Sequence, residues 1–156
     1  MKKFITAVLL TFVLHLQVYS EVVPQGTLVV VQPQKIIDAD DVKQGDTVKF
    51  NIIQPVKVNK EVVFKTGIEV SGKVTKKRNN GILGIPGEIT ISEFQIITQN
   101  NDIIRLTGTI SDKGDNRYWA NIGWFFVFPL LFIKGNDGKI FPNTTHMLYT
   151  AEDYSL

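Results

Sequence analysis

The sequence predicts an all-β protein, a single antiparallel β-barrel or sandwich that follows an N-terminal signal peptide. Several segments beyond residue 20 alternate apolar and polar side chains with a period of two, as strands with one buried face do. Glycine, asparagine and aspartate interrupt these segments at short intervals, and helical periodicity is not sustained anywhere in residues 21–156. Many short strands with such turns are typical of barrels and sandwiches.

The N-terminal segment has the pattern of a secretory signal. A basic start is followed by the apolar run 4–16 and by small residues that offer a signal peptidase a cleavage site before Glu21. The apolar run is about 13 residues long, which is shorter than the roughly 20 residues of a membrane-spanning helix. We therefore expect residues 1–20 to be removed and residues 21–156 to form one domain in the periplasm or cell envelope. A permanent membrane anchor is the alternative.

The charge balance of the exported chain is neutral. The full sequence has 17 Lys and Arg against 15 Asp and Glu, and removal of Lys2 and Lys3 with the signal leaves 15 of each. Nucleic acid is therefore not an expected partner, because its binding requires a concentrated positive surface. The sequence has no cysteine, so neither a disulfide framework nor a lipid-modified cysteine is expected.

The first half of the domain contains three predicted strand regions. A β-branched run at 27–31 ends near Pro33, and a polar loop follows through residues 38–45. The next strand begins at Thr47, where Val48, Phe50 and Ile52 alternate with Lys49 and Asn51. A hairpin over 56–63 with a turn at Asn59-Lys60 precedes a half-buried strand at 68–75, whose inward positions are Ile68, Val70, Gly72 and Val74.

The second half of the domain continues this pattern after a basic, amide-rich stretch, 76–80, that ends at Gly81. A long strand is predicted at 88–97, and Asn100-Asn101-Asp102 favours a hairpin turn from which 103–110 pairs back antiparallel. Residues 112–116 then form a loop, and 139–149 form a last strand or pair of strands.

One segment, 118–133, departs from this pattern because it is almost continuously apolar. It holds both tryptophans and four of the ten phenylalanines. As a helix, residues 122–133 would span about 18 Å, which is less than the roughly 30 Å hydrocarbon core, and Pro129 would interrupt the helix. We therefore expect an apolar insertion near residues 118–133 rather than a transmembrane helix.

Two interpretations of this insertion stay open. Short apolar runs usually form buried strands, so the segment could fill the barrel. Alternatively it projects as a loop that enters a membrane or a groove of a partner, with its indole rings at the polar boundary. The contact residues would then be Trp119, Trp124, Phe125, Phe126, Phe128 and Phe132.

Other candidate sites are weaker. The glycines of 81–87 follow a basic stretch, but Pro86 removes one N–H donor and a strand follows them, so we interpret this segment as a connection and not a phosphate loop. Asp38, Asp40, Asp41 and Asp46 lack the spacing of a helix–loop–helix calcium site, since Lys49 stands where its bidentate Glu would be. We interpret them as a solvated turn.

The residues that catalysis usually requires are also scarce. Beyond the signal the chain has one histidine, His146, and no cysteine, so neither a Cys–His pair nor a histidine-rich zinc site can be assembled. We expect His146 to be a strand residue. Nothing in the sequence places carboxylates such as Glu93 and Asp102 together in a cleft. The predicted protein therefore has no catalytic residues, no metal site and no cofactor.

A series of glycine and aliphatic motifs resembles the β-barrel domain of TrbI-like conjugation and type IV secretion scaffold proteins. The resemblance covers most of residues 26–156 and is specific for a fold more than for a role. It implies that 118–133 corresponds to an apolar excursion of that family that reaches the outer membrane. The tail 149–154 is similar to the family's closing strand. The motifs are Gly26-Thr27-Leu28, Gly45-Asp46-Thr47-Val48, Val56-Lys57-Val58, Val62-Val63-Phe64-Lys65-Thr66-Gly67, Ser71-Gly72, Gly87-Glu88-Ile89-Thr90-Ile91, Leu106-Thr107-Gly108 and Asp112-Lys113-Gly114.

These observations predict a non-enzymatic envelope protein, a barrel scaffold or interaction module whose hydrophobic loop contacts a membrane or a protein assembly. Self-association is a further option. Gly72, Gly81 and Gly87 would serve the fold. The alternative function is a carrier, in which the same aromatic side chains line the barrel interior and hold a lipid or another small apolar molecule. An enzyme is the third and least favoured class.

Overall fold

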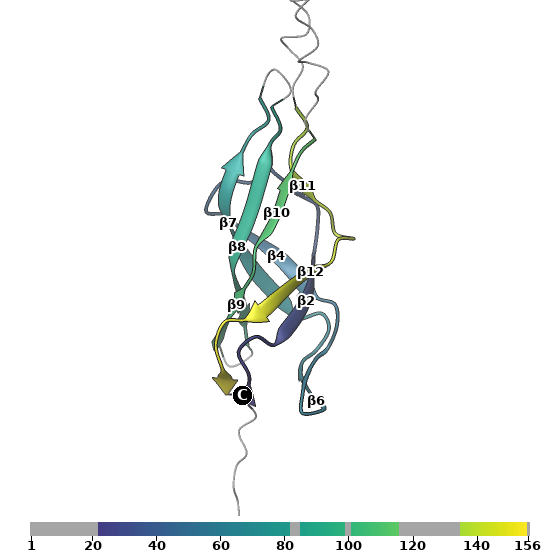
Figure 1. Cartoon of the computed structure of the whole chain (residues 1–156), viewed down its shortest axis with the longest axis vertical. Coiled ribbons are helices and arrows are strands. Elements are labelled where there is room, and N and C mark those ends of the chain that lie inside the picture. Colours follow the sequence, from purple (N-terminus) through teal and green to yellow (C-terminus); the bar gives the residue numbers. More distant parts are fainter. Residues whose placement is uncertain (1–21, 82–84, 99–100, 116–134, 156) are drawn as a thin grey trace, which may run out of the picture.

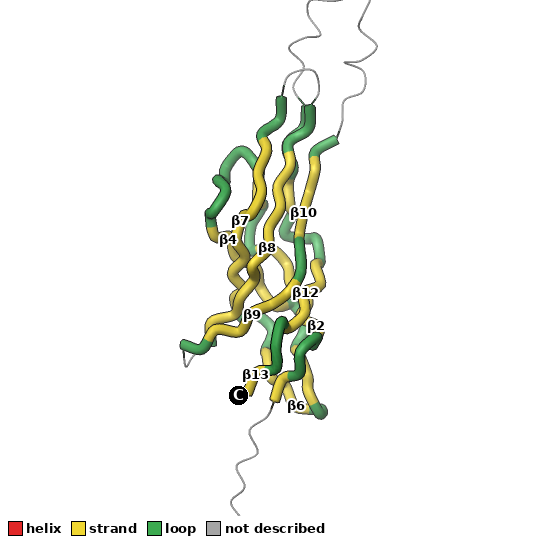
Figure 2. Tube along the Cα trace, turned by 60° about the vertical axis from the view of Figure 1, so that its left-hand side comes forward, coloured by secondary structure: helices red, strands yellow, loops and turns green. Residues whose placement is uncertain are grey.

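The computed structural model describes residues 22–81, 85–98, 101–115 and 135–155, and all regular secondary structure in these ranges is β-strand (Figures 1 and 2). This confirms the all-β prediction, whereas the predicted signal peptide at 1–20 lies outside the described residues. The strands are β1 (Val22–Val23), β2 (Leu28–Pro33), β3 (Ile37–Asp38), β4 (Thr47–Ile52), β5 (Val56–Val58), β6 (Glu61–Phe64), β7 (Glu69–Arg78), β8 (Glu88–Ile97), β9 (Ile103–Thr107), β10 (Ile110–Lys113), β11 (Lys139–Ile140), β12 (His146–Thr150) and β13 (Tyr154–Ser155).

The main sheet closes into a barrel. Its strand order is β10-β8-β7-β4-β2-β12-β9, and β8 also pairs with β9, so six antiparallel strands form a closed ring. The same edge of β8 serves two partners, because its C-terminal half pairs with β9 and its N-terminal half pairs with β10. Of the two predicted architectures, the barrel is therefore the observed one.

The barrel interior is filled by side chains that the period-two pattern identifies. Val48, Phe50 and Ile52 of β4 are buried, as predicted. The rings of Phe50 and Phe94 meet edge to face, with centroids 5.5 Å apart and planes at 74°. Each large apolar side chain buried in this way contributes about 1.5–3 kcal/mol to folding. The other largest fully buried side chains are Ile52, Ile89, Ile91, Ile96, Ile104 and Leu148.

Two predicted turns are confirmed where the structure describes them. Asn59 and Lys60 join β5 to β6 with φ angles of 49° and 75°, the left-handed values that a tight hairpin turn needs. Asn101, between β8 and β9, has φ 69°. Of the single strand or pair of strands predicted at 139–149, the pair is observed, as β11 and β12, and the short strand β13 follows it.

Three predicted boundaries are wrong. The predicted strand at 68–75 ends too early, since β7 continues to Arg78 and pairs there with the start of β8. The predicted strand 103–110 is two strands, because β9 and β10 pair with different halves of β8, on either side of a bulge at Glu93. Finally, the predicted loop 112–116 begins too early, since β10 runs to Lys113.

The two ends of the described chain meet at one end of the barrel (Figure 1). β1 pairs with β13, and the buried hydroxyl of Thr150 donates to the carbonyl of Pro24 at 2.6 Å and accepts the Thr27 N–H at 2.9 Å. The ends of β7, β8 and β10 extend from the opposite end of the barrel (Figure 2). Within the described ranges, no helix has the length and hydropathy that a membrane crossing requires.

Candidate functional site

The most informative part of the structure is the extension from which the chain leaves toward the apolar segment. We call it the root, and it consists of residues 78–81, 85–88, 112–115 and 135–138. The described chain stops at Asp115 and resumes at Gly135, and both residues belong to the root (Figure 1). Asp115 and Gly135, which flank the residues 116–134 in the sequence, therefore lie at the same end of the barrel.

Glycines allow the backbones of the root to touch one another. A Cβ at Gly114 would overlap the carbonyl of Asn136, and a Cβ at Gly135 would overlap the carbonyl of Ile85. At Gly138, a Cβ would lie 2.7 Å from the carbonyl oxygen of Asp112. These obstacles are backbone atoms, which cannot rotate away as the end of a side chain can. The glycines before and after the apolar segment are thus a packing requirement of the root.

A network of backbone hydrogen bonds joins the same four pieces of chain. The predicted structural role of Gly81 and Gly87 is consistent with this network, because both N–H groups donate to carbonyls instead of pointing to a phosphate. The hydrogen bonds are Gly81 N–H to Ile85 O (2.9 Å), Gly87 N–H to Asn136 O (2.9 Å), Gly114 N–H to Gly87 O (3.0 Å) and Gly135 N–H to Gly81 O (3.1 Å).

Side chains reinforce the network on one flank of the root. The Asn80 amide donates to the carbonyl of Gly135 at 2.9 Å, and the Lys139 N–H donates to the Asp112 carboxylate at 2.8 Å. The Lys139 ammonium also pairs with Asp38 at 2.6 Å. Burial opposes ionisation of Asp38, but the hydrogen bond and charge of Lys139 outweigh it and lower the pKa of Asp38.

Asp137 has an unusual environment in the same flank. Its Oδ1 atom is buried and has no hydrogen-bond partner among the described residues. The carboxylate accepts one hydrogen bond from the backbone N–H of Asn80. Burial, together with the negative charges of Asp40 and Asp38, raises the pKa of Asp137 above its ordinary value of 3.8.

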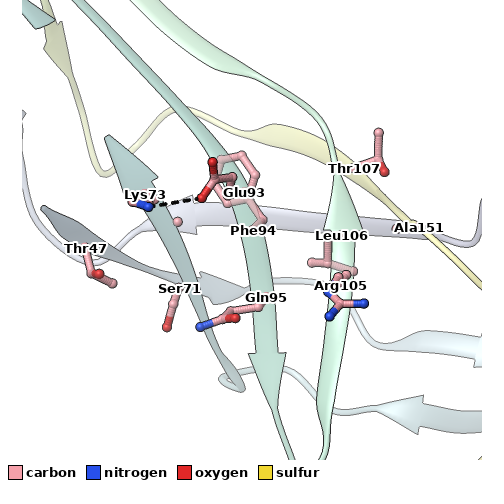
Figure 3. Close-up of a pocket in the computed structure, with 11 residues that line it drawn as sticks. Thr47, Ser71, Lys73, Glu93, Phe94, Gln95, Arg105, Leu106, Thr107 and Ala151 are labelled. Carbon is pink, nitrogen blue, oxygen red and sulfur yellow. Dashed lines mark ion pairs between the residues drawn. The ribbon is translucent and has the colours of Figure 1, made fainter. Parts of the chain in front are cut away.

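A second candidate is a hollow of about 690 Å³ on the outer wall of the barrel (Figure 3). It lies beside the bulge of β8, where Glu93 adopts a left-handed φ of 54° and its carboxylate meets the Lys73 ammonium at 3.4 Å. At the bulge, β8 has one extra residue opposite β7. The Glu93 side chain is exposed there. The lining residues are Thr47, Ser71, Gly72, Lys73, Glu93, Phe94, Gln95, Arg105, Leu106, Thr107 and Ala151.

The chemistry of this hollow is mixed. Lys73 and Arg105 are exposed, and each makes one long ion-pair contact of 3.4 Å, to Glu93 and to Glu152 respectively. Phe94 and Leu106 are buried below the surface, so the hollow presents no aromatic face. A second hollow of about 820 Å³, between the loop 34–46 and β4, is likewise lined by both charges and aliphatic side chains.

The predicted contact residues Trp119, Trp124, Phe125, Phe126, Phe128 and Phe132 lie outside the described residues. The acidic turn is described, and two of its four carboxylates have protein partners: Asp38 pairs with Lys139, and Asp46 accepts the Lys43 N–H at 2.8 Å. Across residues 22–81, 85–98, 101–115 and 135–155, no three Asp, Glu or His side chains are grouped so as to hold a metal ion.

The remaining candidates take separate positions. His146 is the first residue of β12, as predicted; its Nε2 atom lies 3.1 Å from the Thr144 hydroxyl, and burial lowers its pKa. Glu93 pairs with Lys73, whereas Asp102 contacts the Tyr154 hydroxyl. These two carboxylates therefore have different partners, one on β7 and one on β13.

Asp137 was not identified in the sequence analysis. Nor were the close backbone contacts of Gly114 and Gly135 in the root, which we call the clasp. One signal was present, because Gly114 and Gly135 flank the apolar segment. The position of Asp137 beside Asp38 and Asp40 had no local signal, since about 100 residues separate them in the chain. A scan against protein-family models and a search of curated proteins found no match for this chain.

Proposed function

We propose that this protein is a non-catalytic scaffold or interaction module of the cell envelope. Its barrel is exported, and the apolar segment 118–133 contacts a membrane or a protein assembly. The contacts are made by Trp119, Trp124, Phe125, Phe126, Phe128 and Phe132. The protein would share the barrel fold and the apolar excursion of the TrbI-like scaffold proteins that its sequence resembles.

The observation that carries this proposal is the root. Gly114 and Gly135 lie close together, in a clasp that tolerates no side chain at either position. Gly87, directly before β8, accepts the Gly114 N–H and donates to the Asn136 carbonyl, so residues on both sides of the apolar segment are joined to the barrel wall. Such an attachment suits a segment that presents a contact surface at a defined position relative to a rigid barrel.

The packing of the barrel supports the same proposal. Side chains of the described strands form one continuous core, in which Phe50, Phe94 and Leu148 are almost completely buried. These side chains, which come from the described strands, pack against one another in the interior. A contact role for those side chains is therefore favoured over a role in the barrel interior.

The test compares the mature chain with a double variant, Trp124→Ser/Phe126→Ser. We expect its cosedimentation with phosphatidylethanolamine–phosphatidylglycerol vesicles to fall roughly tenfold or more, since each buried aromatic is worth more than about 1.4 kcal/mol. Thermal stability should be unchanged. The matched control is Phe141→Ser/Met147→Ser, which removes two exposed apolar side chains from the described barrel and should leave binding intact. A large loss of stability in the first variant would assign the segment to the core.

Two further measurements separate the other options. A carrier would retain a small apolar molecule in native mass spectrometry, whereas a scaffold with a filled barrel would not. Light scattering without lipid measures self-association. If the double variant binds vesicles as the unaltered protein does, and differs from it only in self-association, the contact is between copies of the chain and not with a membrane.

A further inference from the structure

The orphaned carboxylate oxygen of Asp137 is an anomaly that the proposed function does not explain. Buried polar atoms almost always have a hydrogen-bond partner, because leaving one unpaired is costly. Asp137 nevertheless occupies the centre of the root: its neighbours Gly135, Asn136 and Gly138 make the closest backbone contacts there. We infer that Asp137 makes the root a proton-responsive clasp, which holds more tightly when this carboxyl is protonated.

The charged groups around Asp137 favour the protonated form. The turn after β3 brings two negative charges, Asp38 and Asp40, toward the carboxylate, and β11 brings one positive charge, Lys139. Lys139 is already engaged, because its ammonium pairs with Asp38 at 2.6 Å. The backbone N–H of Asn80 hydrogen-bonds the carboxylate, but the Oδ1 atom has no partner among the described residues.

The other charged groups of the root have partners of their own. Glu88, at the start of β8, pairs with Lys76 at 2.9 Å and with Arg78 at 3.6 Å. Asp112 of β10 accepts the Lys139 N–H. Lys77 of β7 acts on Asp38, whose pKa it helps to lower. None of these contacts supplies the missing partner of Asp137.

The order of protonation follows from the two neighbouring carboxyls. The pKa of Asp137 lies above 3.8 and the pKa of Asp38 lies below it. As the pH falls, Asp137 is therefore protonated first, while the Asp38–Lys139 pair is still intact. In this window the half-buried Asp137 loses a negative charge that burial and the two neighbouring carboxylates disfavour, and the root keeps its ion pair.

The effect on stability has a defined sign. An acid whose folded pKa is raised contributes stability that is fully present below its unfolded pKa and is lost as the pH rises through its folded pKa. Protonation of Asp137 therefore stabilises the root at mildly acidic pH. This inference concerns the root itself and holds whether or not residues 118–133 contact a membrane.

Amide hydrogen exchange tests the inference directly. Protection factors, corrected for intrinsic exchange, are measured for Asn80, Gly87 and Gly114 in the unaltered protein and in Asp137→Asn, which imitates the protonated carboxyl. As the pH falls from 7 into the acidic range, we expect the root of the unaltered protein to gain protection, because the closed root binds this proton more tightly than the opened root does. The Asp137→Asn root should already have the higher protection at pH 7.

Controls distinguish this mechanism from a general effect of pH. Asp41→Asn removes an exposed carboxylate from the turn that carries Asp38 and Asp40, and should keep the pH response of the unaltered protein. A carboxyl carbon NMR titration of the unaltered protein should place the midpoint of Asp137 above 3.8. The inference fails if that midpoint lies at or below 3.8. It also fails if Asp137→Asn loses root protection at every pH, since the ionised carboxylate would then be the stabilising form.

Discussion

The ring of Phe94 lies in the space that a side chain at Gly72 would occupy. A Cβ on Gly72 would be 2.5 Å from the Phe94 Cε1 atom and 2.8 Å from the Ile91 Cγ2 atom. This close approach between β7 and β8 lets the Phe94 ring reach Phe50 across the core. The absence of a side chain at Gly72 thus determines where the Phe94 ring can lie.

The first prediction concerns this contact. Gly72→Ala should lower the free energy of unfolding by about 1–3 kcal/mol, because the new methyl group overpacks a filled core. Urea denaturation measures the change. Ser71→Ala, on the adjacent outward position, should change stability by less than about 0.5 kcal/mol. The double variant Gly72→Ala/Phe94→Leu should recover part of the loss; if it is no more stable than Gly72→Ala alone, the ring is not the obstacle.

The second prediction concerns the clasp. Gly135→Ala should open the root locally, since its Cβ would meet the Ile85 carbonyl and not a movable side chain. Hydrogen exchange should show faster exchange at Gly81 and Gly87, while Phe50 in β4 keeps its protection. Gly81→Ala is the matched control, because its Cβ would lie 3.2 Å from the Ile85 Cβ atom and needs only a small adjustment. Equal effects of the two variants would contradict the clasp.

The third prediction concerns the buried hydroxyl of Thr150. Thr150→Val keeps the shape of the side chain but removes the two hydrogen bonds of the Thr150 hydroxyl, to the Pro24 carbonyl and from the Thr27 N–H. The Pro24 carbonyl then keeps only the Thr27 hydroxyl at 2.7 Å and the Thr27 N–H at 3.3 Å. We expect a loss of about 1–3 kcal/mol in the free energy of unfolding. Thr150→Ser, which keeps the hydroxyl, should lose less. Thr107→Val, at an exposed position of the paired strand β9, should be nearly neutral.

The fourth prediction concerns the ion pair that joins β3 to β11. Asp38→Asn should lower the free energy of unfolding at pH 7 by about 1 kcal/mol, since the pair is partly exposed. The pKa of Asp38 is lowered on folding, so its contribution is present above the unfolded value of 3.8 and is lost as the pH falls through the folded pKa. The variant and the unaltered protein should therefore converge in urea denaturation at strongly acidic pH. A difference that persists there would mean that the charge of Asp38 is not responsible.

Local sequence patterns are sufficient to locate most of the strands, without knowledge of which strands pair. The alternation from Val48 to Ile52 identifies β4 and its buried face, and Asn59-Lys60 identifies a hairpin turn, because both signals lie within a few consecutive residues. The long strand at 88–97 matches β8 at both ends. The sequence alone therefore determined that this protein is built from antiparallel strands, and which side chains of β4 enter its core.

The tertiary structure decided what the strands enclose and where the chain leaves them. A period of two is the same in a barrel and in a sandwich. Closure of the sheet into a barrel depends on the pairing of β8 with both β7 and β9. The clasp at Gly114 and Gly135 and the carboxyls around Asp137 join positions about 20 to 100 residues apart. Such contacts leave no local pattern, because their energies depend on backbones and charges that only the folded chain brings together.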